Sequence, residues 1–275
     1  LEILLGAISS GLLLGMVIAL VALGLNLLQQ QKFSDAEGVL RECLAIRQQQ
    51  QPEAWSTFNA QSMLGEALWG QEKYAEAWEV LRNGLLANPD EITLYGMIER
   101  LTEKLGRQAE YESLLQGLAS KSTPAQEPVK AYAEWMRRQG RLNEAIAFVE
   151  TRHKAEPENA PLLQTLVNLY TAAKRYPEAL EAYARLAQVQ PKDVFSLRSW
   201  ATLADQHGTL EQRIRAYEAL YKAVPDEITT GLKLARLYQQ NGQRQKAIDL
   251  LSEMQSDFPK NEDIQRLLNE IIASR

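Results

Sequence analysis

The chain has 275 residues, of which 45% are apolar and 24% charged, and this composition excludes a wholly disordered protein. Its 30 basic and 35 acidic side chains give a formal net charge of −5, which argues against a basic nucleic-acid coat; no nucleic-acid partner is expected. One cysteine, Cys43, and two histidines far apart in sequence, His153 and His207, offer neither a disulfide nor a metal-ligand pattern, so no metal and no cofactor is predicted.

The first predicted element is an apolar helix within residues 1–28. No Asp, Glu, Lys or Arg occurs from Ile3 to Leu28, and a membrane-spanning helix needs roughly 20 such residues. The run is longer than the apolar region of a signal peptide, and Glu2 is the only charge before it, which favours an uncleaved single-pass transmembrane helix. The alternative is that Val17–Leu28 is simply the buried first helix of the domain that follows.

Two further features of this segment bear on topology and on self-association. Lys32, Arg41 and Arg47 follow the segment and no basic residue precedes it, so the positive-inside rule places the rest of the chain in a bacterial cytoplasm rather than the periplasm. A stripe of small residues, which lets two helices approach closely in lipid, predicts a homodimer, although such residues also serve packing against other helices. The stripe consists of Ala7, Gly11, Gly15 and Ala19.

Beyond the apolar segment, the sequence repeats with a period of 34 residues. Pro157, Pro191, Pro225 and Pro259 are spaced by 34. A second column of mostly small residues keeps the same register twelve positions earlier: Ala77, Tyr111, Ala145, Ala179, Arg213 and Ala247. A fixed period of this length is typical of helical-repeat arrays, and a chain with only 15 Gly and 10 Pro favours an all-α fold.

Each repeat is predicted to contain two amphipathic helices. In the unit at 160–193, apolar residues recur at i, i+3, i+4 and i+7 from Leu163 to Tyr170, and Pro177 then opens a second helix. About seven units follow one another, the first lengthened by the glutamine tract at Gln48–Gln51, and a capping helix at 262–275 ends the array. The predicted units are 17–57, 58–91, 92–125, 126–159, 160–193, 194–227 and 228–261.

This pattern resembles the tetratricopeptide repeat (TPR) family. The family's large, small and aromatic positions in the first helix are matched by Leu166, Val167 and Tyr170, and Pro191 matches its closing proline. Tyr111 and Arg213 replace the usual small residue of the second helix, and we expect altered packing at both. The resemblance implies an all-α solenoid, a right-handed superhelix of antiparallel helix pairs, whose first helices line a concave groove for an extended peptide or partner protein.

The same resemblance indicates which side chains face the groove. Their basic members exceed the acidic ones by three, which predicts an acidic or carboxylate-bearing partner; solvated helix faces with pairs such as Lys130 with Glu134 are the alternative. The amide of Asn168 could hold a ligand backbone. The candidate partner-binding residues are Arg100, Lys104, Lys130, Glu134, Arg137, Asn168, Arg198, Lys233 and Arg236.

Catalysis is not predicted, because no nucleophile is paired with a base, and Cys43 lies on an apolar helix face where a packing role is expected. We expect a membrane-tethered scaffold or adaptor that binds a partner protein in its groove, for assembly of a membrane or envelope complex. The alternative is a soluble regulatory or scaffold subunit of an enzyme complex, in which the apolar segment is buried.

Overall fold

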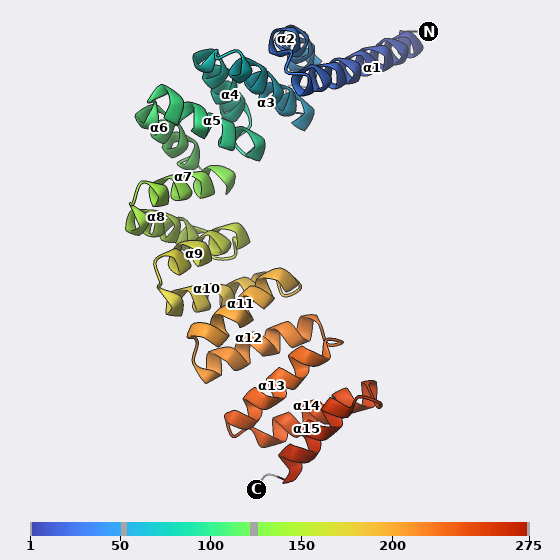
Figure 1. Cartoon of the computed structure of the whole chain (residues 1–275), viewed down its shortest axis with the longest axis vertical. Helices are drawn as coiled ribbons and strands as arrows, with labels where there is room; N and C mark the ends of the chain where they lie inside the picture. Colours follow the sequence, from blue (N-terminus) through green and yellow to red (C-terminus); the bar gives the residue numbers. More distant parts are fainter. Residues whose placement is uncertain (1, 51–53, 122–125, 274–275) are drawn as a thin grey trace. The chain divides into compact units, whose positions relative to one another are not determined.

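The computed structural model describes residues 2–50, 54–121 and 126–273, with side chains from residue 15 onward except that of Trp55. Within these ranges the chain forms α-helices α1 to α15 and no strand (Figure 1), so the predicted all-α helical-repeat fold is confirmed. The helices divide into two compact units, Leu1–Trp135 and Met136–Arg275.

In the first unit, consecutive helices from α1 to α6 pack against each other, and the first helices α1, α3 and α5 also contact one another in turn. Such nearest-neighbour packing is what a stacked repeat array requires. The second helix of the first pair, α2, is 18 residues long and α4 is 14, because the glutamine tract extends α2. The helices are α1 (Glu2–Gln29), α2 (Phe33–Gln50), α3 (Trp55–Gly70), α4 (Tyr74–Ala87), α5 (Ile92–Leu105), α6 (Gln108–Ala119) and α7 (Gln126–Arg138), the last three residues of α7 belonging to the second unit.

In the second unit consecutive helices from α8 to α15 also pack against each other, and the core is continuous from α12 through α15, where Leu234, Leu251 and Ile264 are buried together. Leucine side chains from each helix thus close the space that a single helix pair leaves open. The helices are α8 (Leu142–Ala155), α9 (Ala160–Ala172), α10 (Tyr176–Val189), α11 (Val194–His207), α12 (Leu210–Ala223), α13 (Ile228–Gln240), α14 (Arg244–Asp257) and α15 (Glu262–Ala273).

The turn between the two helices of a repeat also follows the 34-residue period. A residue with positive φ occupies it in six repeats: Gln31, in the longer first repeat, and Glu72, Gly106, Gly140, Lys174 and Gly242. Glycine adopts this left-handed conformation without steric cost, whereas Glu72 and Lys174 do not. At the equivalent position, Gly208 is extended (φ −89°, ψ 157°), and Thr209 caps α12 through a reciprocal capping box with Gln212.

The two residues that depart from the small column are accommodated in different ways. Tyr111 is buried, and its ring lies edge-on to Trp135 with centroids 5.0 Å apart. Arg213 does not enter the core; its Nε donates to Asp205 of α11 at 2.9 Å. The altered packing predicted at both positions is therefore confirmed, as an aromatic pair in one repeat and an ion pair in the other.

The C-terminal half of α1 packs as the first helix of a repeat. Val17 and Leu28 are buried, and Gly24 lies so close to α2 that an added Cβ would be 2.7 Å from Leu40 Cδ2. The thiol of Cys43 is buried beneath α1, with Sγ 3.9 Å from the carbonyl oxygen of Val17. This is the packing expected if Val17–Leu28 begins the first repeat.

No helix in the described part of the chain combines the length and apolar character needed to cross a membrane. The single-pass helix predicted at Ile3–Leu28 is thus not supported there. Of the predicted small-residue stripe, the side chains of Ala7 and Gly11 lie outside the described residues. Gly15 has no neighbour within 4 Å of an added Cβ, and Ala19 is exposed.

A shielded carboxylate joins the helices at the start of the array. The carboxylate of Glu37 in α2 accepts hydrogen bonds from Lys73 Nζ (2.7 Å), Arg41 Nε (2.7 Å) and Gln71 Nε2 (2.8 Å). Burial raises the pKa of Glu37, but the donors Lys73, Arg41 and Gln71 outweigh it and lower that pKa from 4.5 to about 2. Since Gln71 and Lys73 flank the turn before α4, the network fixes that turn against α2.

Candidate partner-binding face

The two candidate cations of α5, Arg100 and Lys104, lie against aromatic rings. Arg100 Cζ lies 5.5 Å from the centroid of Trp69, and Lys104 Nζ lies 5.2 Å from that of Tyr74. The two rings are themselves edge-to-face, with centroids 5.1 Å apart. Attraction to the π faces offsets the repulsion between the two cations, which are one helical turn apart.

On α7, Lys130 pairs with a different acidic residue from the one expected from the sequence. Lys130 Nζ lies 3.3 Å from Glu127 Oε2, one turn before it, and this pair replaces the expected pair with Glu134. Glu134 is half-buried and Arg137 is exposed in the last turn of the helix. Because the Lys130 pair is largely exposed, it contributes little to stability.

In the second unit, polar side chains link α9 to α11 along the surface formed by the first helices α9, α11 and α13, which we call the first-helix face. The hydroxyl of Ser196 lies 3.3 Å from the amide oxygen of Gln164, and Gln164 Nε2 donates to Asn168 Oδ1 at 3.3 Å. Asn168 is exposed, and its amide nitrogen makes no hydrogen bond among the described residues. Its two N–H donors therefore point to solvent and can serve a ligand.

A hollow of about 320 Å³ opens on this face between α11 and α13. Its rim carries Arg198 and Lys233, and its floor is formed by Tyr217 and Leu220 of α12. Arg198 Nη1 donates to Glu227 Oε1 at 2.9 Å, which helps to hold the pKa of Glu227 below its usual value. The structure thus brings two of the predicted cations to one site, although the sequence separates them by 35 residues.

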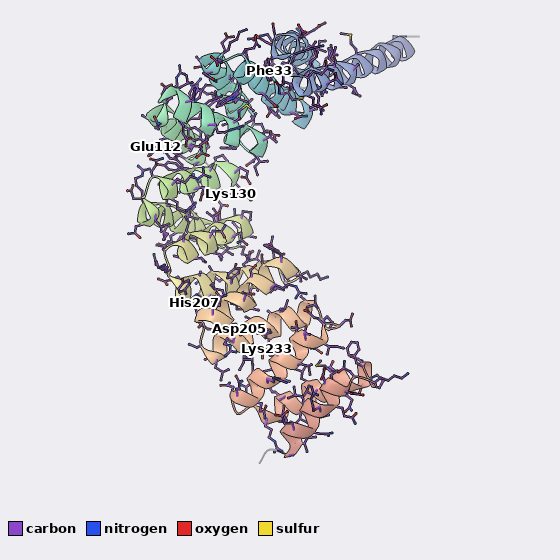
Figure 2. All side chains as sticks on the ribbon, viewed as in Figure 1. Phe33, Glu112, Lys130, Asp205, His207 and Lys233 are labelled. Carbon is purple, nitrogen blue, oxygen red and sulfur yellow. The ribbon has the colours of Figure 1, made fainter. Side chains whose placement is uncertain are left out.

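Asp205 is the polar centre beside this hollow (Figure 2). It accepts from Tyr217 Oη at 2.8 Å and Arg213 Nε at 2.9 Å, and Lys233 Nζ lies 3.3 Å away. Burial raises the pKa of Asp205, but the hydrogen bonds from Tyr217 and Arg213 and the ammonium of Lys233 prevail and lower it. Asp205 is consequently ionised at neutral pH and joins α11, α12 and α13.

These pairs reduce the basic excess that the sequence indicates. Arg198, Lys233 and Lys130 each have an acidic partner within 3.3 Å. Arg236 is exposed and forms no ion pair within the described ranges. The sequence count missed Glu227 because it lies in the loop before α13, outside the helix positions assigned to the groove.

The most exposed large apolar residue of this face was not predicted from the sequence. Phe195, in the first turn of α11, is 81% exposed, and it is adjacent in sequence to Ser196, which contacts Gln164. Phe195 could have been identified from the sequence, because it follows a predicted helix start and occupies a position of the repeat that faces the groove. Full burial of such a side chain stabilises a complex by about 1.5–3 kcal/mol, so a partner that covers Phe195 gains affinity.

Antiparallel helix pairs that repeat every 34 residues and present a polar first-helix face define a helical-repeat protein of the interaction class. One family model described as tetratricopeptide repeat matches residues 136–201 and 207–271, and a second with the same description matches residues 18–49. Together the models cover more than half of the sequence, and the chain belongs to the tetratricopeptide repeat family.

Solved structures with a similar fold share little sequence with this chain. A tetratricopeptide repeat protein from Parabacteroides merdae is 14% identical, with a TM-score of 0.41 and coverage of 94% of this chain and 99% of that one. The C-terminal part of a repeat protein from Cytophaga hutchinsonii is 14% identical, with a TM-score of 0.46 and coverage of 90% and 98%. A chain of the APC/C hetero-tetramer Cut9–Hcn1 is 13% identical (TM-score 0.38, 86% of this chain), and the match spans 46% of that chain's length. No curated protein matches the sequence.

Proposed function

We propose that this protein is a non-catalytic scaffold that binds an extended segment of a partner protein on its first-helix face. The observation that carries the proposal is the position of Phe195, 81% exposed in α11, the helix that also supplies Arg198 to the rim of the hollow. Lone exposed apolar residues are common on protein surfaces, but here ligand-competent polar groups share the face. An apolar side chain of the partner would cover Phe195.

The neighbouring polar groups define the rest of the partner's chemistry. The free N–H donors of Asn168 suit a backbone carbonyl of an extended chain. An acidic side chain of the partner could displace Glu227 from Arg198, since that pair is exposed enough to exchange with solvent. The proposed ligand is therefore an extended peptide segment with an apolar residue flanked by an acidic one.

Site-specific photo-crosslinking tests this proposal. Benzoylphenylalanine in place of Phe195 is expected to capture one partner from a native extract, whereas the same group at Leu86, which is 41% exposed on the second helix α4, should not. Asn168→Ala and Arg198→Gln should each reduce capture at position 195 with little change in the melting temperature, because the Arg198 pair is largely exposed. Equal capture at positions 86 and 195, or capture insensitive to both substitutions, contradicts the proposal.

A second proposal, that the scaffold is attached to a membrane through α1, is supported by a different observation. The run from Ile3 to Leu28 carries no charge, and on either flank of the packed side of α1 the apolar side chains Met16, Ile18, Leu23 and Leu25 are exposed. Lipid would cover this apolar side. We further propose that the repeats lie in the cytoplasm. We also propose that the small-residue stripe, of which Gly15 and Ala19 are accessible, forms the contact between two copies of α1 in a homodimer.

Fractionation separates this attachment from the alternative of a soluble subunit. The attached protein remains in the pellet after carbonate washing, and a variant with both Ile18→Asp and Leu25→Asp is released. If the unmodified chain is found in the supernatant, the attachment proposal is refuted and the soluble subunit is favoured. Digestion of the repeats by protease added outside intact spheroplasts contradicts the cytoplasmic orientation.

A further inference from the structure

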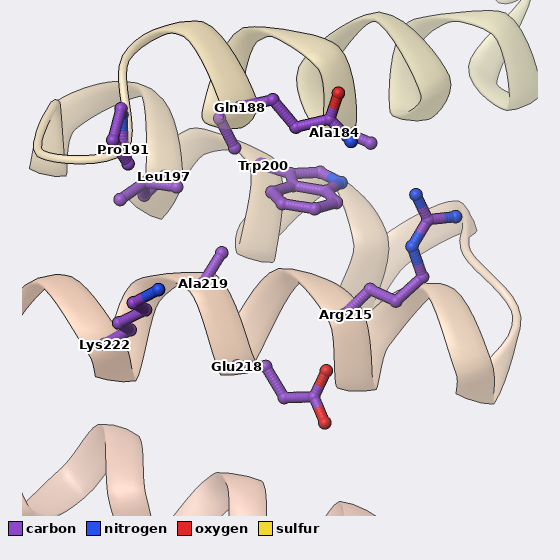
Figure 3. Close-up of a pocket in the computed structure, with 10 residues that line it drawn as sticks. Ala184, Gln188, Pro191, Leu197, Trp200, Arg215, Glu218, Ala219 and Lys222 are labelled. Carbon is purple, nitrogen blue, oxygen red and sulfur yellow. The ribbon is translucent and has the colours of Figure 1, made fainter.

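A second hollow, of about 590 Å³, lies on the other side of the second unit, between the second helices α10 and α12 (Figure 3). Its wall is apolar where Ala184, Ala187 and Leu197 contribute, and polar at Arg215, Gln188 and Lys222. None of these residues lines the hollow on the first-helix face. Its volume lies within the range of about 300–1,000 Å³ that is typical of small-molecule sites.

The indole of Trp200 forms part of this hollow and carries an unused hydrogen-bond donor. Trp200 is only 5% exposed, and its Nε1 has no hydrogen-bond partner among the described residues. In Figure 3 the nitrogen edge of the ring faces the side on which the guanidinium of Arg215 lies. A buried N–H without an acceptor is unfavourable, and a ligand oxygen at this position would remove the deficit.

Comparison with the preceding repeat shows that these groups are particular to this hollow. A smaller hollow of about 170 Å³ lies between α8 and α10, where Leu166 and Glu181 hold the positions 34 residues before Trp200 and Arg215. The exchange of an apolar side chain for an N–H donor, and of a carboxylate for a guanidinium, makes the larger hollow suitable for an anion.

The charges around the hollow are arranged to leave it positive. The carboxylate of Glu218 accepts a hydrogen bond from Tyr238 Oη at 2.7 Å and points away from the indole (Figure 3). Arg215 is half-exposed, and its nearest acidic neighbour, Glu181, is 3.9 Å away, at the limit of an ion pair. Lys222 is exposed and forms no ion pair within the described ranges.

We propose that this hollow binds a carboxylate carried on an apolar body. One carboxylate oxygen accepts from Trp200 Nε1 and the other pairs with Arg215, while the apolar body lies along Ala184, Ala187 and Leu197. The carboxylate could be that of a small organic acid or that of a peptide C-terminus, which share this chemistry. The proposal is independent of partner binding on the first-helix face, because no residue is common to the two sites.

Titration followed by ¹H–¹⁵N NMR of the indole N–H signals tests the proposal in the full chain. Trp200→Phe assigns the Trp200 signal by its disappearance. Octanoate is expected to move that signal downfield with saturation in the millimolar range, corresponding to roughly 1 mM affinity. Octanamide, which has the same apolar body without charge, should bind at least about tenfold more weakly, and so should octanoate to Arg215→Gln.

Glu178→Gln, which alters the smaller hollow of the preceding repeat, is the matched control and should leave the titration unchanged. Acetyl-Ala-Leu with a free carboxylate, compared with its amide, distinguishes the sources: a response to the free peptide alone assigns a peptide end, and a response to octanoate alone assigns a small acid. The proposal is overturned if no carboxylate moves the Trp200 signal up to about 10 mM, or if octanamide and octanoate bind equally.

Discussion

Replacement of Gly24 by alanine tests whether α1 is the first helix of the array. A Cβ at this position would lie 2.7 Å from Leu40 Cδ2 and 2.9 Å from Leu40 Cγ, and Leu40 is fully buried. Since the branch point of Leu40 is among the close atoms, a rotation of its terminal methyl groups cannot relieve the contact. Helix α1 or Leu40 must therefore shift.

Two opposing effects set the size of the change. Overpacking of a filled site costs about 1–3 kcal/mol, and alanine in place of glycine returns about 1 kcal/mol through helix propensity. The middle of that range leaves a net loss of about 1 kcal/mol, which increases local opening about fivefold. Gly38→Ala in α2 is the matched control, because nothing lies within 4 Å of its added Cβ and only the stabilising effect of about 1 kcal/mol remains.

Cys43 reports the opening directly, because it is the single cysteine of the chain and is fully buried beneath α1. The rate of its reaction with Ellman's reagent, relative to the urea-unfolded chain, gives the free energy of local opening. We expect labelling about fivefold faster in Gly24→Ala and two- to fivefold slower in Gly38→Ala. If the two variants protect Cys43 equally, α1 does not pack on α2 as described.

Three further predictions concern other repeats. The pKa of Glu37 is about 2 in the folded chain and 4.5 in the unfolded chain, so its contribution to stability is complete above pH 4.5 and is lost as the pH falls toward 2. The urea midpoints of Glu37→Gln and wild type should therefore differ at pH 7 and converge in acid. Tyr111→Ala should lower the free energy of unfolding by about 3–5 kcal/mol, because it leaves a cavity beside Trp135, and a shift of Trp135 emission would accompany it. Lys174→Gly should raise the melting temperature through about 0.5–1 kcal/mol of relieved strain at φ +57°, whereas the same change at Lys192, outside that conformation, should not.

The periodic part of the fold was predictable because it depends on residue size at fixed positions. The fully buried alanines Ala77, Ala145, Ala179 and Ala247 follow the 34-residue column, and close helix contact at these points admits only a small side chain. The apolar run at Ile3–Leu28 is ambiguous by composition, because a first helix that packs on α2 and a membrane span are both apolar.

The contacts of the candidate face were not predictable from the register. Arg198 and Glu227 are 29 residues apart, and their pairing depends on where the loop before α13 places Glu227. The cations of α5 pair with rings of α3 and α4, which a count of helix-face charges cannot detect. The amide of Asn168 was identified from its register position, but its link through Gln164 to α11 required the packing of two repeats.

The repeat at 194–227 departs from the common pattern at several points. Its small position is taken by Arg213, whose charge is compensated by Asp205, and its inter-helix turn at Gly208 is extended rather than left-handed. The exposed Phe195 and the unpaired indole of Trp200 lie on the same helix, α11. In an array stabilised by nearest-neighbour contacts, one repeat can deviate while its neighbours maintain the stack. This repeat carries exposed, charged and unpaired groups on both of its surfaces, where other repeats carry residues that serve packing. We therefore expect ligand recognition to be concentrated in this repeat.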